Sequence, residues 1–219
     1  MAEILTISSP RIKVHDLWNT VCLSTIVVLD VLYLLRTDFS LVLTDEGLAH
    51  SNAAEFSFFF YFFAGYIALD TLYLLAVPAC VPSEQSLIIV HHLFTGAIIL
   101  VPYYMPRYSI YFAITALVEI NTISIIARRN VVKDSTVYEV LNVFFMASYV
   151  LFRLVMFPLL VLVFLWEWRR HTLEVGTGWN IVLLAPALQL CITALSAQGW
   201  IVLMMKNSQR AKTQREKQL

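Results

Sequence analysis

Long apolar runs alternate with short polar connections along the chain, and this pattern predicts membrane-spanning helices. A helix needs about 20 mostly apolar residues to cross a hydrocarbon core about 30 Å thick. Turn-forming residues such as Pro78, Pro82, Pro102 and Pro106 separate several of the runs. The predicted fold class is therefore an all-α integral membrane protein, a single bundle of about six transmembrane helices. The predicted spans are residues 17–35, 56–77, 86–104, 108–127, 140–166 and 179–205.

Composition agrees with a membrane protein. Hydrophobic residues make up 59% of the chain and charged residues only 14%, with a mean hydropathy of +0.74. A soluble domain carries about a quarter charged residues. The equal numbers of basic and acidic residues, 15 each, give no indication of nucleic-acid binding. Cys22, Cys80 and Cys191 are far apart in the sequence, so neither a disulfide framework nor a zinc site is indicated.

The distribution of Lys and Arg predicts the orientation. With the N-terminus in the cytosol, ten of the 15 basic residues fall on the cytosolic side, four fall on the other side, and Arg153 lies within a span. Both termini are therefore expected to be cytosolic. The predicted organisation is an N-terminal cytosolic segment over 1–16, a transmembrane domain over 17–205, and a basic cytosolic tail over 206–219, which we expect to be disordered.

Six ionisable residues fall within the predicted spans, where each is costly. The insertion cost of Asp or Arg at the centre of a span is about 2.5–3.5 kcal/mol, so such residues are expected to face the bundle interior and to have partners. Four of them are expected at nearly one depth, roughly 8–12 Å from the cytosolic ends of their spans, and Arg153 at roughly 20 Å. The six residues are Asp30, Asp70, His91, His92, Glu119 and Arg153.

Polar residues at helical spacing accompany this set, as in the series Tyr66, Asp70 and Tyr73. Each such series forms a polar stripe along one face of its helix. These stripes predict a hydrated or ligand-accepting cavity that opens toward the cytosol. Because adjacent residues on a helix point about 100° apart, His91 and His92 cannot face one reacting atom together. We expect one ring to face the cavity and the other to contact a neighbouring helix.

A carboxylate beside the cavity-facing ring would fix its tautomer and raise its basicity, and Asp70 and Glu119 are both candidates for that role. Such a histidine could act as a general base or as a nucleophile toward an acyl group. The alternative is that the polar groups only bridge helices, which is the better interpretation for Asp30. Candidate contacts to substrate or to a lipid headgroup are Arg153, Thr95, Asn121 and Tyr149.

The chain has too few histidines for a membrane di-iron site. Membrane di-iron oxygenases need about eight histidines in repeated boxes, whereas this chain has five, and His15, His50 and His171 lie outside the predicted spans. A di-iron site is therefore excluded. A single zinc ion on His91, Asp70 and Glu119 has no supporting ligand spacing. We expect no metal site and no bound cofactor.

Four ordered motifs resemble the TLC-domain family, which includes the ceramide synthases. The resemblance extends over about residues 17–205. It places Asp70 at the family's aspartate, His91 and His92 at its paired histidines with Thr95 at the usual spacing, and Glu119, Arg153 and Pro158 at matching positions. The motifs read AGYIALDTLYLL (64–75), VHHLFTGAIIL (90–100), LVEINTISIIARR (117–129) and FFMASYVLFRLVMFP (144–158).

This resemblance implies a helical bundle of the endoplasmic reticulum that handles acyl lipids. In the ceramide synthases, paired histidines and nearby acids transfer an acyl chain from acyl-CoA to a sphingoid amine. Those enzymes carry a histidine and paired aspartates in the next helix, where this chain reads LVEINT and keeps only Glu119. The chain therefore resembles the small TLC-domain proteins linked to phospholipid composition more than the synthases.

Two functional classes stay open on these grounds. The first is an acyl-CoA-dependent acyltransferase that acts on lipid, in sphingolipid or membrane lipid metabolism. The second is a non-catalytic protein that binds lipid or regulates membrane lipid composition. A proton-coupled transporter is a third interpretation, but no inverted repeat supports it. The expected partners are membrane lipids and acyl chains, a homodimer is compatible with the sequence, and acyl-CoA is the co-substrate of the first class.

Overall fold

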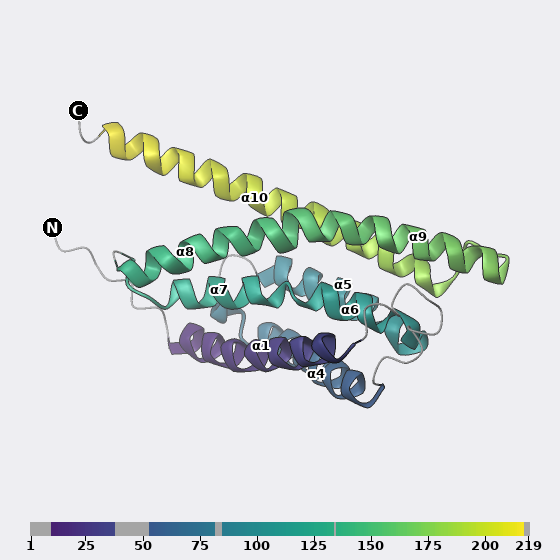
Figure 1. Cartoon of the computed structure of the whole chain (residues 1–219). Coiled ribbons are helices and arrows are strands. Elements are labelled where there is room, and N and C mark those ends of the chain that lie inside the picture. Colours follow the sequence, from purple (N-terminus) through teal and green to yellow (C-terminus); the bar gives the residue numbers. More distant parts are fainter. Residues whose placement is uncertain (1–9, 38–52, 82–84, 134, 217–219) are drawn as a thin grey trace. The chain divides into compact units, whose positions relative to one another are not determined.

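The computed structural model describes residues 10–37, 53–81, 85–133 and 135–216 (Figure 1). Most of these residues are helical, and none of them lies in a strand. Six helical segments are long and apolar enough to cross a membrane, which confirms the predicted all-α membrane class with about six spans. They are Ile12–Arg36, Phe56–Ala76, Gln85–Tyr104, Pro106–Arg129, Thr136–Val175 and Ile181–Met205.

The chain forms two compact units, Met1–Tyr149 and Val150–Leu219. In the first unit, α1 packs against α4, α6 and α7, α4 packs against α5, and α7 packs against α8 (Figure 1). The helices of this unit are α1 (Pro10–Arg36), α4 (Ala53–Ala76), α5 (Gln85–Tyr104), α6 (Ser109–Ala116), α7 (Glu119–Arg129) and α8 (Thr136–Ser148), with the short 3₁₀ helices η1 (Pro78–Cys80) and η2 (Pro106–Tyr108).

Local sequence accounts for several helix ends. Pro10 begins α1, where the missing N–H of proline costs nothing because the first helical N–H groups have no partner within the helix. Pro78 and Pro106 begin the two 3₁₀ turns in the same way. The side chain of Ser135 caps α8 by accepting a hydrogen bond from the backbone N–H of Tyr138 at 3.2 Å.

Helix α1 starts at Pro10 rather than at residue 17, and this difference brings a polar residue into the bundle. A buried stripe follows the helix at intervals of three and four residues, the spacing of one helical face. The stripe contains polar groups at both ends and apolar ones between them. Its members are His15, Asn19, Cys22, Ile26, Asp30 and Tyr33.

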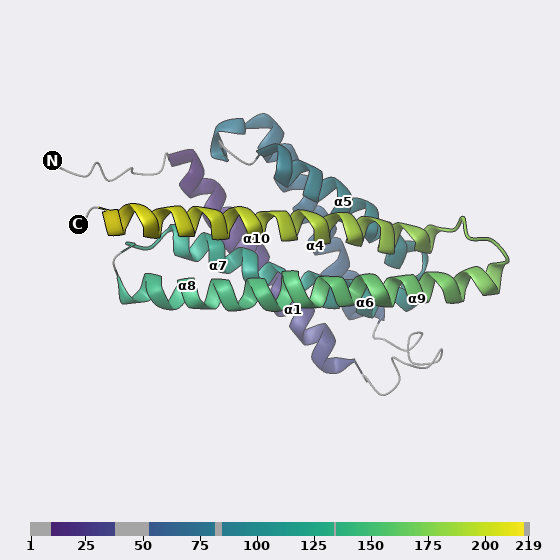
Figure 2. The ribbon, with the colours of Figure 1, turned by 90° about the horizontal axis from the view of Figure 1, so that it is seen from above.

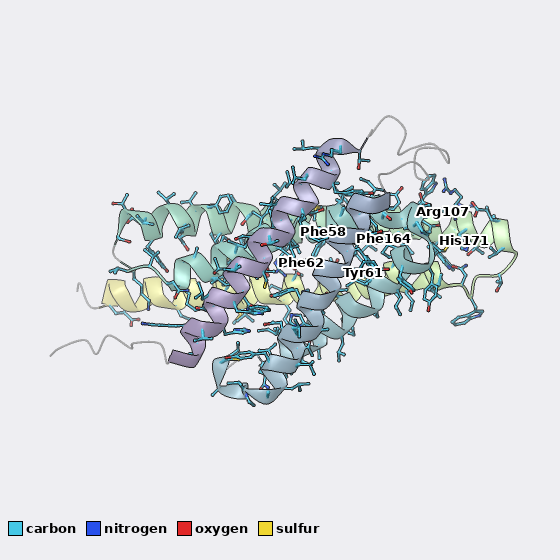
Figure 3. The ribbon with its side chains drawn as sticks, turned by 90° about the horizontal axis from the view of Figure 1, so that it is seen from below. Phe58, Tyr61, Phe62, Arg107, Phe164 and His171 are labelled. Carbon is cyan, nitrogen blue, oxygen red and sulfur yellow. The ribbon has the colours of Figure 1, made fainter. Side chains whose placement is uncertain are left out.

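The aromatic start of α4 divides between packing and the outer surface. Phe56, Phe59 and Phe63 are buried, and each ring lies within 6.2 Å, centroid to centroid, of the ring of Phe112 on α6. Phe58 and Tyr61 project away from this cluster (Figure 3). The cluster fixes the end of α4 that is remote from Asp70.

The second unit begins at Val150, within the π-helix η3 (Tyr149–Met156). It contains the antiparallel pair α9 (Phe157–Val175) and α10 (Leu184–Glu216), joined through η4 (Ile181–Leu183) (Figure 2). Gly176 ends α9 with a positive φ of 74°, a left-handed conformation that glycine adopts without steric cost. The expectation of a disordered tail was wrong for residues 206–216, because α10 continues to Glu216.

Candidate functional site

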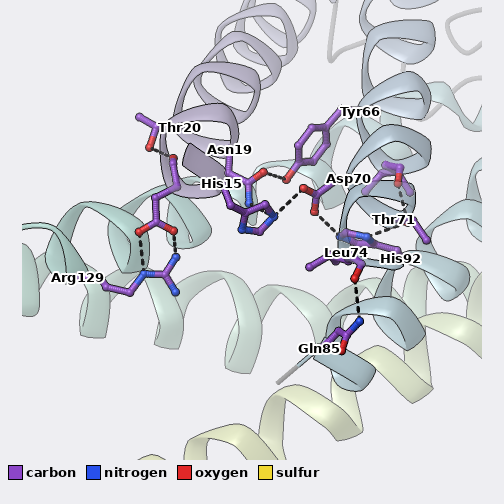
Figure 4. A network of polar contacts seen from close by, with 12 residues as sticks. His15, Asn19, Thr20, Tyr66, Asp70, Thr71, Leu74, Gln85, His92 and Arg129 are labelled. Atoms are coloured by element: carbon purple, nitrogen blue, oxygen red, sulfur yellow. Dashed lines mark hydrogen bonds and ion pairs between the residues drawn. The ribbon is translucent and has the colours of Figure 1, made fainter. Parts of the chain in front are cut away.

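Asp70 is the centre of a buried polar cluster in the first unit (Figure 4). It lies near the end of α4, where the beginnings of α1 and α5 meet it. Its Oδ1 lies 2.9 Å from Nε2 of His15, and its Oδ2 lies 3.8 Å from Nε2 of His92. One carboxylate, only 1% exposed, therefore faces two imidazoles from two other helices.

The two hydrogen bonds of the Thr71 hydroxyl assign the tautomer of His92. The hydroxyl of Thr71 donates its only hydrogen to the carbonyl oxygen of Ile67 at 2.6 Å, as serine and threonine often do within helices. Thr71 Oγ1 must then accept from Nδ1–H of His92 at 3.0 Å. In neutral His92 the lone pair is consequently on Nε2, which faces Asp70. Both ring nitrogens of His92 are thus directed at α4.

His15 has the opposite arrangement. Its Nε2 donates to Asp70 and cannot at the same time accept from the amide of Asn19, which lies 3.3 Å away. Its ring stacks on Tyr73 at 5.4 Å between centroids and 6° between planes. Its Nδ1 is buried and has no hydrogen-bond partner within the described residues. Leaving such a group unsatisfied costs about 1–3 kcal/mol, so it calls for a functional explanation.

Two contacts outside the cluster hold these helices in register. Asp16 accepts hydrogen bonds from the guanidinium of Arg129, including one from Nε at 3.0 Å (Figure 4). It also accepts one from the amide of Asn130 at 2.9 Å. This ties the start of α1 to the end of α7. Gln85 donates to the carbonyl oxygen of Leu74 at 2.8 Å and so ties the start of α5 to the end of α4.

An apolar cluster lies beside these contacts, at the turn between α4 and α5. It is formed by Leu74, Cys80 and Val81, with Val77 and Ile88 packed against it. Burial raises the pKa of the Cys80 thiol, and the negative charge of Asp70 raises it further. Cys80 is thus kept as a neutral, packed side chain next to the charged cluster.

Of the residues predicted as catalytic, the structure brings Asp70 and His92 together. His92 is the ring that contacts the neighbouring helix, as expected for one member of the pair. His91 is half-buried, with its ring centroid 6.0 Å from that of His92. Glu119 is buried in the first turn of α7 and acts electrostatically on Asp30 and Tyr66. Of the two candidate carboxylates, Asp70 is the one that the structure places beside His92.

The residues predicted to contact substrate or headgroup lie in different places. Asn121 is buried and donates to the carbonyl oxygen of Phe145 at 3.1 Å and to Ser148 Oγ at 3.0 Å, so its amide connects α7 to α8. Tyr149 is buried at the start of η3, and Thr95 is half-buried on α5. Arg153 lies in η3, within the second unit.

Sequence reasoning missed His15, Asn19 and Thr71. His15 was placed outside the first span because the apolar run becomes continuous only after residue 17. The signal that could have found it is the spacing of three and four residues that joins His15 to the other members of the buried stripe, up to Tyr33. Thr71 gave no sequence signal, since its role depends on α5 packing beside α4.

Asp30 behaves differently from its prediction. It was interpreted as a bridge between helices, but neither carboxylate oxygen has a hydrogen-bond partner among the residues that the structure describes, and its exposure is 0%. The bridging interpretation was therefore wrong within this part of the chain.

The geometry of the cluster fits proton transfer. Within the described ranges, no group of three or more His, Cys, Asp or Glu side chains is arranged to hold a metal ion. A carboxylate bonded to one nitrogen of an imidazole fixes the tautomer, leaves the other nitrogen as acceptor, and stabilises the ring when it becomes protonated. His15 and Asp70 have this arrangement.

Comparison with known proteins gives one match. A family model described as the TLC domain matches residues 14–206, which begin beside His15 and extend through most of α10. No curated protein and no solved structure matches the chain.

Proposed function

The chain belongs to the TLC-domain family, and from this premise we propose that it transfers an acyl chain from acyl-CoA to a lipid acceptor. The family assignment confirms the resemblance carried by the four sequence motifs. The protein is a multi-pass membrane protein whose family and composition are consistent with a lipid-related function. The transfer reaction, a sphingolipid or other lipid acceptor, and a location in the endoplasmic reticulum are parts of the proposal.

The observation that carries the proposal is the Asp70 carboxylate held between His15 and His92. Acyl transfer from a thioester requires removal of a proton from the acceptor hydroxyl or amine, and histidine supported by a carboxylate is the usual protein group for that task. The cluster lies close to one end of α1, α4 and α5, so a site there is near one membrane surface. A water-soluble CoA group can reach such a depth while the acyl chain stays in the bilayer.

The remaining predicted residues have supporting roles in this proposal. His91 lies on the same helical turn as His92, and in this proposal it helps to bind the acyl donor, acyl-CoA. Glu119, at the N-terminus of α7, is placed where the helix dipole stabilises a negative charge. Thr95, Asn121 and Tyr149, in the first unit, are proposed contacts for the headgroup or phosphate. Arg153, in the second unit, is separately proposed as a headgroup contact.

One observation favours a second function, lipid binding without turnover. Both nitrogens of His92 are directed at protein groups, Thr71 and Asp70, as expected for a side chain that holds helices together. A protein of this kind would retain a bound lipid and would release no CoA.

The experiment that separates the two functions is a CoA-release assay on the purified full chain in lipid nanodiscs with palmitoyl-CoA. Acyl transfer predicts release of free CoA thiol and an acylated lipid by mass spectrometry, both reduced in His92→Ala. The matched control is His171→Ala, on α9, where the ring pairs with Glu174. Unmodified protein with co-purified lipid, no CoA release, and identical behaviour of both variants would support the binding function instead.

A further inference from the structure

The two histidines around Asp70 are not equivalent, and the difference assigns their roles. His15 binds Asp70 through Nε2 at 2.9 Å, and its Nδ1 has no hydrogen-bond partner within the described residues. His92 has Nδ1 on Thr71 and Nε2 toward Asp70. We propose that Nδ1 of His15 is the general base of the acyl transfer and that His92 is a positioning residue. This inference rests on the proposed function.

The surroundings of His15 hold its ring in one orientation. The ring is clamped between the hydrogen bond to Asp70 and the stack on Tyr73, both from α4. The next residue, Asp16, binds Arg129 and Asn130 at the end of α7, which fixes the backbone of α1 at this point. A base must be held within hydrogen-bond reach of the proton that it removes, so a locked ring with one free nitrogen meets the geometric requirement.

His92 does not meet that requirement. Its Nδ1–H is needed by Thr71, whose own hydrogen is on the carbonyl oxygen of Ile67. Its Nε2 points at Oδ2 of Asp70, the oxygen that His15 does not use. His92 therefore acts through Asp70 by position: its ring lies against Oδ2 at 3.8 Å, and Oδ1 is left to receive the Nε2–H of His15.

In the proposed step, His15 takes one proton from the acceptor and passes it to the leaving group. The acceptor oxygen or nitrogen of the lipid attacks the thioester carbonyl carbon while its proton passes to Nδ1 of His15. The ring becomes an imidazolium, and the negative charge of Asp70 stabilises it through the Nε2–H hydrogen bond. The bond between carbonyl carbon and sulfur then breaks, and the CoA thiolate takes the proton from Nδ1. The products are the acylated lipid and free CoA thiol, and His15 returns to its starting state.

The test compares His15→Gln with His92→Asn in the full chain. Glutamine places an amide N–H near the position of Nε2, so it can keep the hydrogen bond to Asp70 while removing the base. Asparagine in place of His92 likewise keeps an N–H donor for Thr71 and removes the second nitrogen. His15→Gln thus removes Nδ1 and keeps the hydrogen bond to Asp70. His92→Asn removes Nε2 and keeps the hydrogen bond to Thr71.

Turnover is measured as CoA release from palmitoyl-CoA in vesicles that contain a lysophospholipid and a long-chain amine as acceptors. We expect His15→Gln to lower kcat by about 10²–10⁴-fold with KM for palmitoyl-CoA nearly unchanged. We expect His92→Asn to lose at most about 10–100-fold, the effect of removing an orienting partner. Thermal unfolding of both variants should stay close to that of the wild type.

The outcomes separate the inference from the proposed function. Turnover in the wild type that persists in His15→Gln overturns the assignment of His15 and leaves acyl transfer standing. A larger loss in His92→Asn than in His15→Gln overturns it as well. Absence of turnover in the wild type overturns the proposed function and this inference together.

Discussion

Two buried aspartates on neighbouring helices of the first unit have opposite surroundings. Asp70, on α4, contacts His15 and lies beside His92, and it is the meeting point of three helices. Asp30, on α1, is equally buried, yet within the described residues neither of its oxygens has a hydrogen-bond partner.

The comparison shows that burial alone does not tell whether the surroundings of an aspartate can stabilise its ionised form. An ionised carboxylate away from water needs partners that compensate the lost hydration. Asp70 has an N–H donor and a second ring that can carry a proton, so a negative charge is compensated there. Asp30 has no such compensation, so a neutral side chain of the same shape should serve equally well at its position.

The largest expected effect is on turnover in Asp70→Asn. The asparagine oxygen can still accept from Nε2–H of His15, and its amide can donate to Nε2 of His92, so the helices stay together. The negative charge that stabilises a protonated imidazole is lost. We expect turnover to fall by about 10²–10⁴-fold with little change in unfolding temperature. Turnover close to that of the wild type would show that the charge of Asp70 has no part in the chemistry.

A smaller effect, on stability, is expected from Asp16→Ala. This change removes the acceptor of Arg129 and Asn130 and frees the start of α1 from α7. We expect a loss of about 1–3 kcal/mol in the free energy of unfolding, since the hydrogen bonds involve charged groups. Equilibrium unfolding in mixed micelles measures it, with Lys133→Ala at an exposed position as the control. Equal stability of both variants would contradict the clamp between α1 and α7.

The next effect concerns Asn121→Ala, which breaks the link between α7 and α8. Loss of its bonds to Phe145 and Ser148 should cost about 0.6–2 kcal/mol, the usual contribution of an interhelical hydrogen bond in a membrane protein. The same variant tests the predicted substrate contact: a rise in KM at unchanged kcat would give Asn121 that role as well. Unchanged stability together with unchanged KM would leave Asn121 without either role.

The smallest effect is expected from Asp30→Asn. The substitution keeps the size of the side chain and breaks no hydrogen bond seen in the described part of the chain. We expect the free energy of unfolding to change by less than about 0.5 kcal/mol and turnover to stay at the wild-type level. A loss as large as that of Asp70→Asn would mean that the two aspartates are equivalent and would break the comparison.

Apolar runs predicted the spans well because the length of a helix that crosses a bilayer is fixed by the bilayer itself. Helix ends were predicted less well. The fourth span was expected as one helix over 108–127, but α6 ends at Ala116 and α7 starts at Glu119. The fifth extends from Thr136 to Val175 and passes Pro158, with a π-helical segment just before the proline. Such segments depend on local backbone hydrogen bonds that hydropathy does not record.

The candidate site was predicted in part. The common depth of Asp70 and His92 followed from counting residues along two helices, and the structure places them together. His15 could not be found this way, because its depth depends on where α1 begins. Thr71 and Asn19 could not be found because hydrogen-bond partners between helices depend on how the helices rotate against one another.

The most direct test of the central claim, that Asp70 holds two differently bonded imidazoles, is nitrogen-15 NMR of histidine-labelled protein in lipid bilayers. The signals of His15 and His92 are assigned with the His15→Gln and His92→Asn variants. The account predicts a protonated Nε2 and an unprotonated Nδ1 for His15, a protonated Nδ1 for His92, and shifts of both residues, but not of His171, in Asp70→Asn. The opposite tautomer at His15, with signals that do not respond to Asp70→Asn, would contradict it.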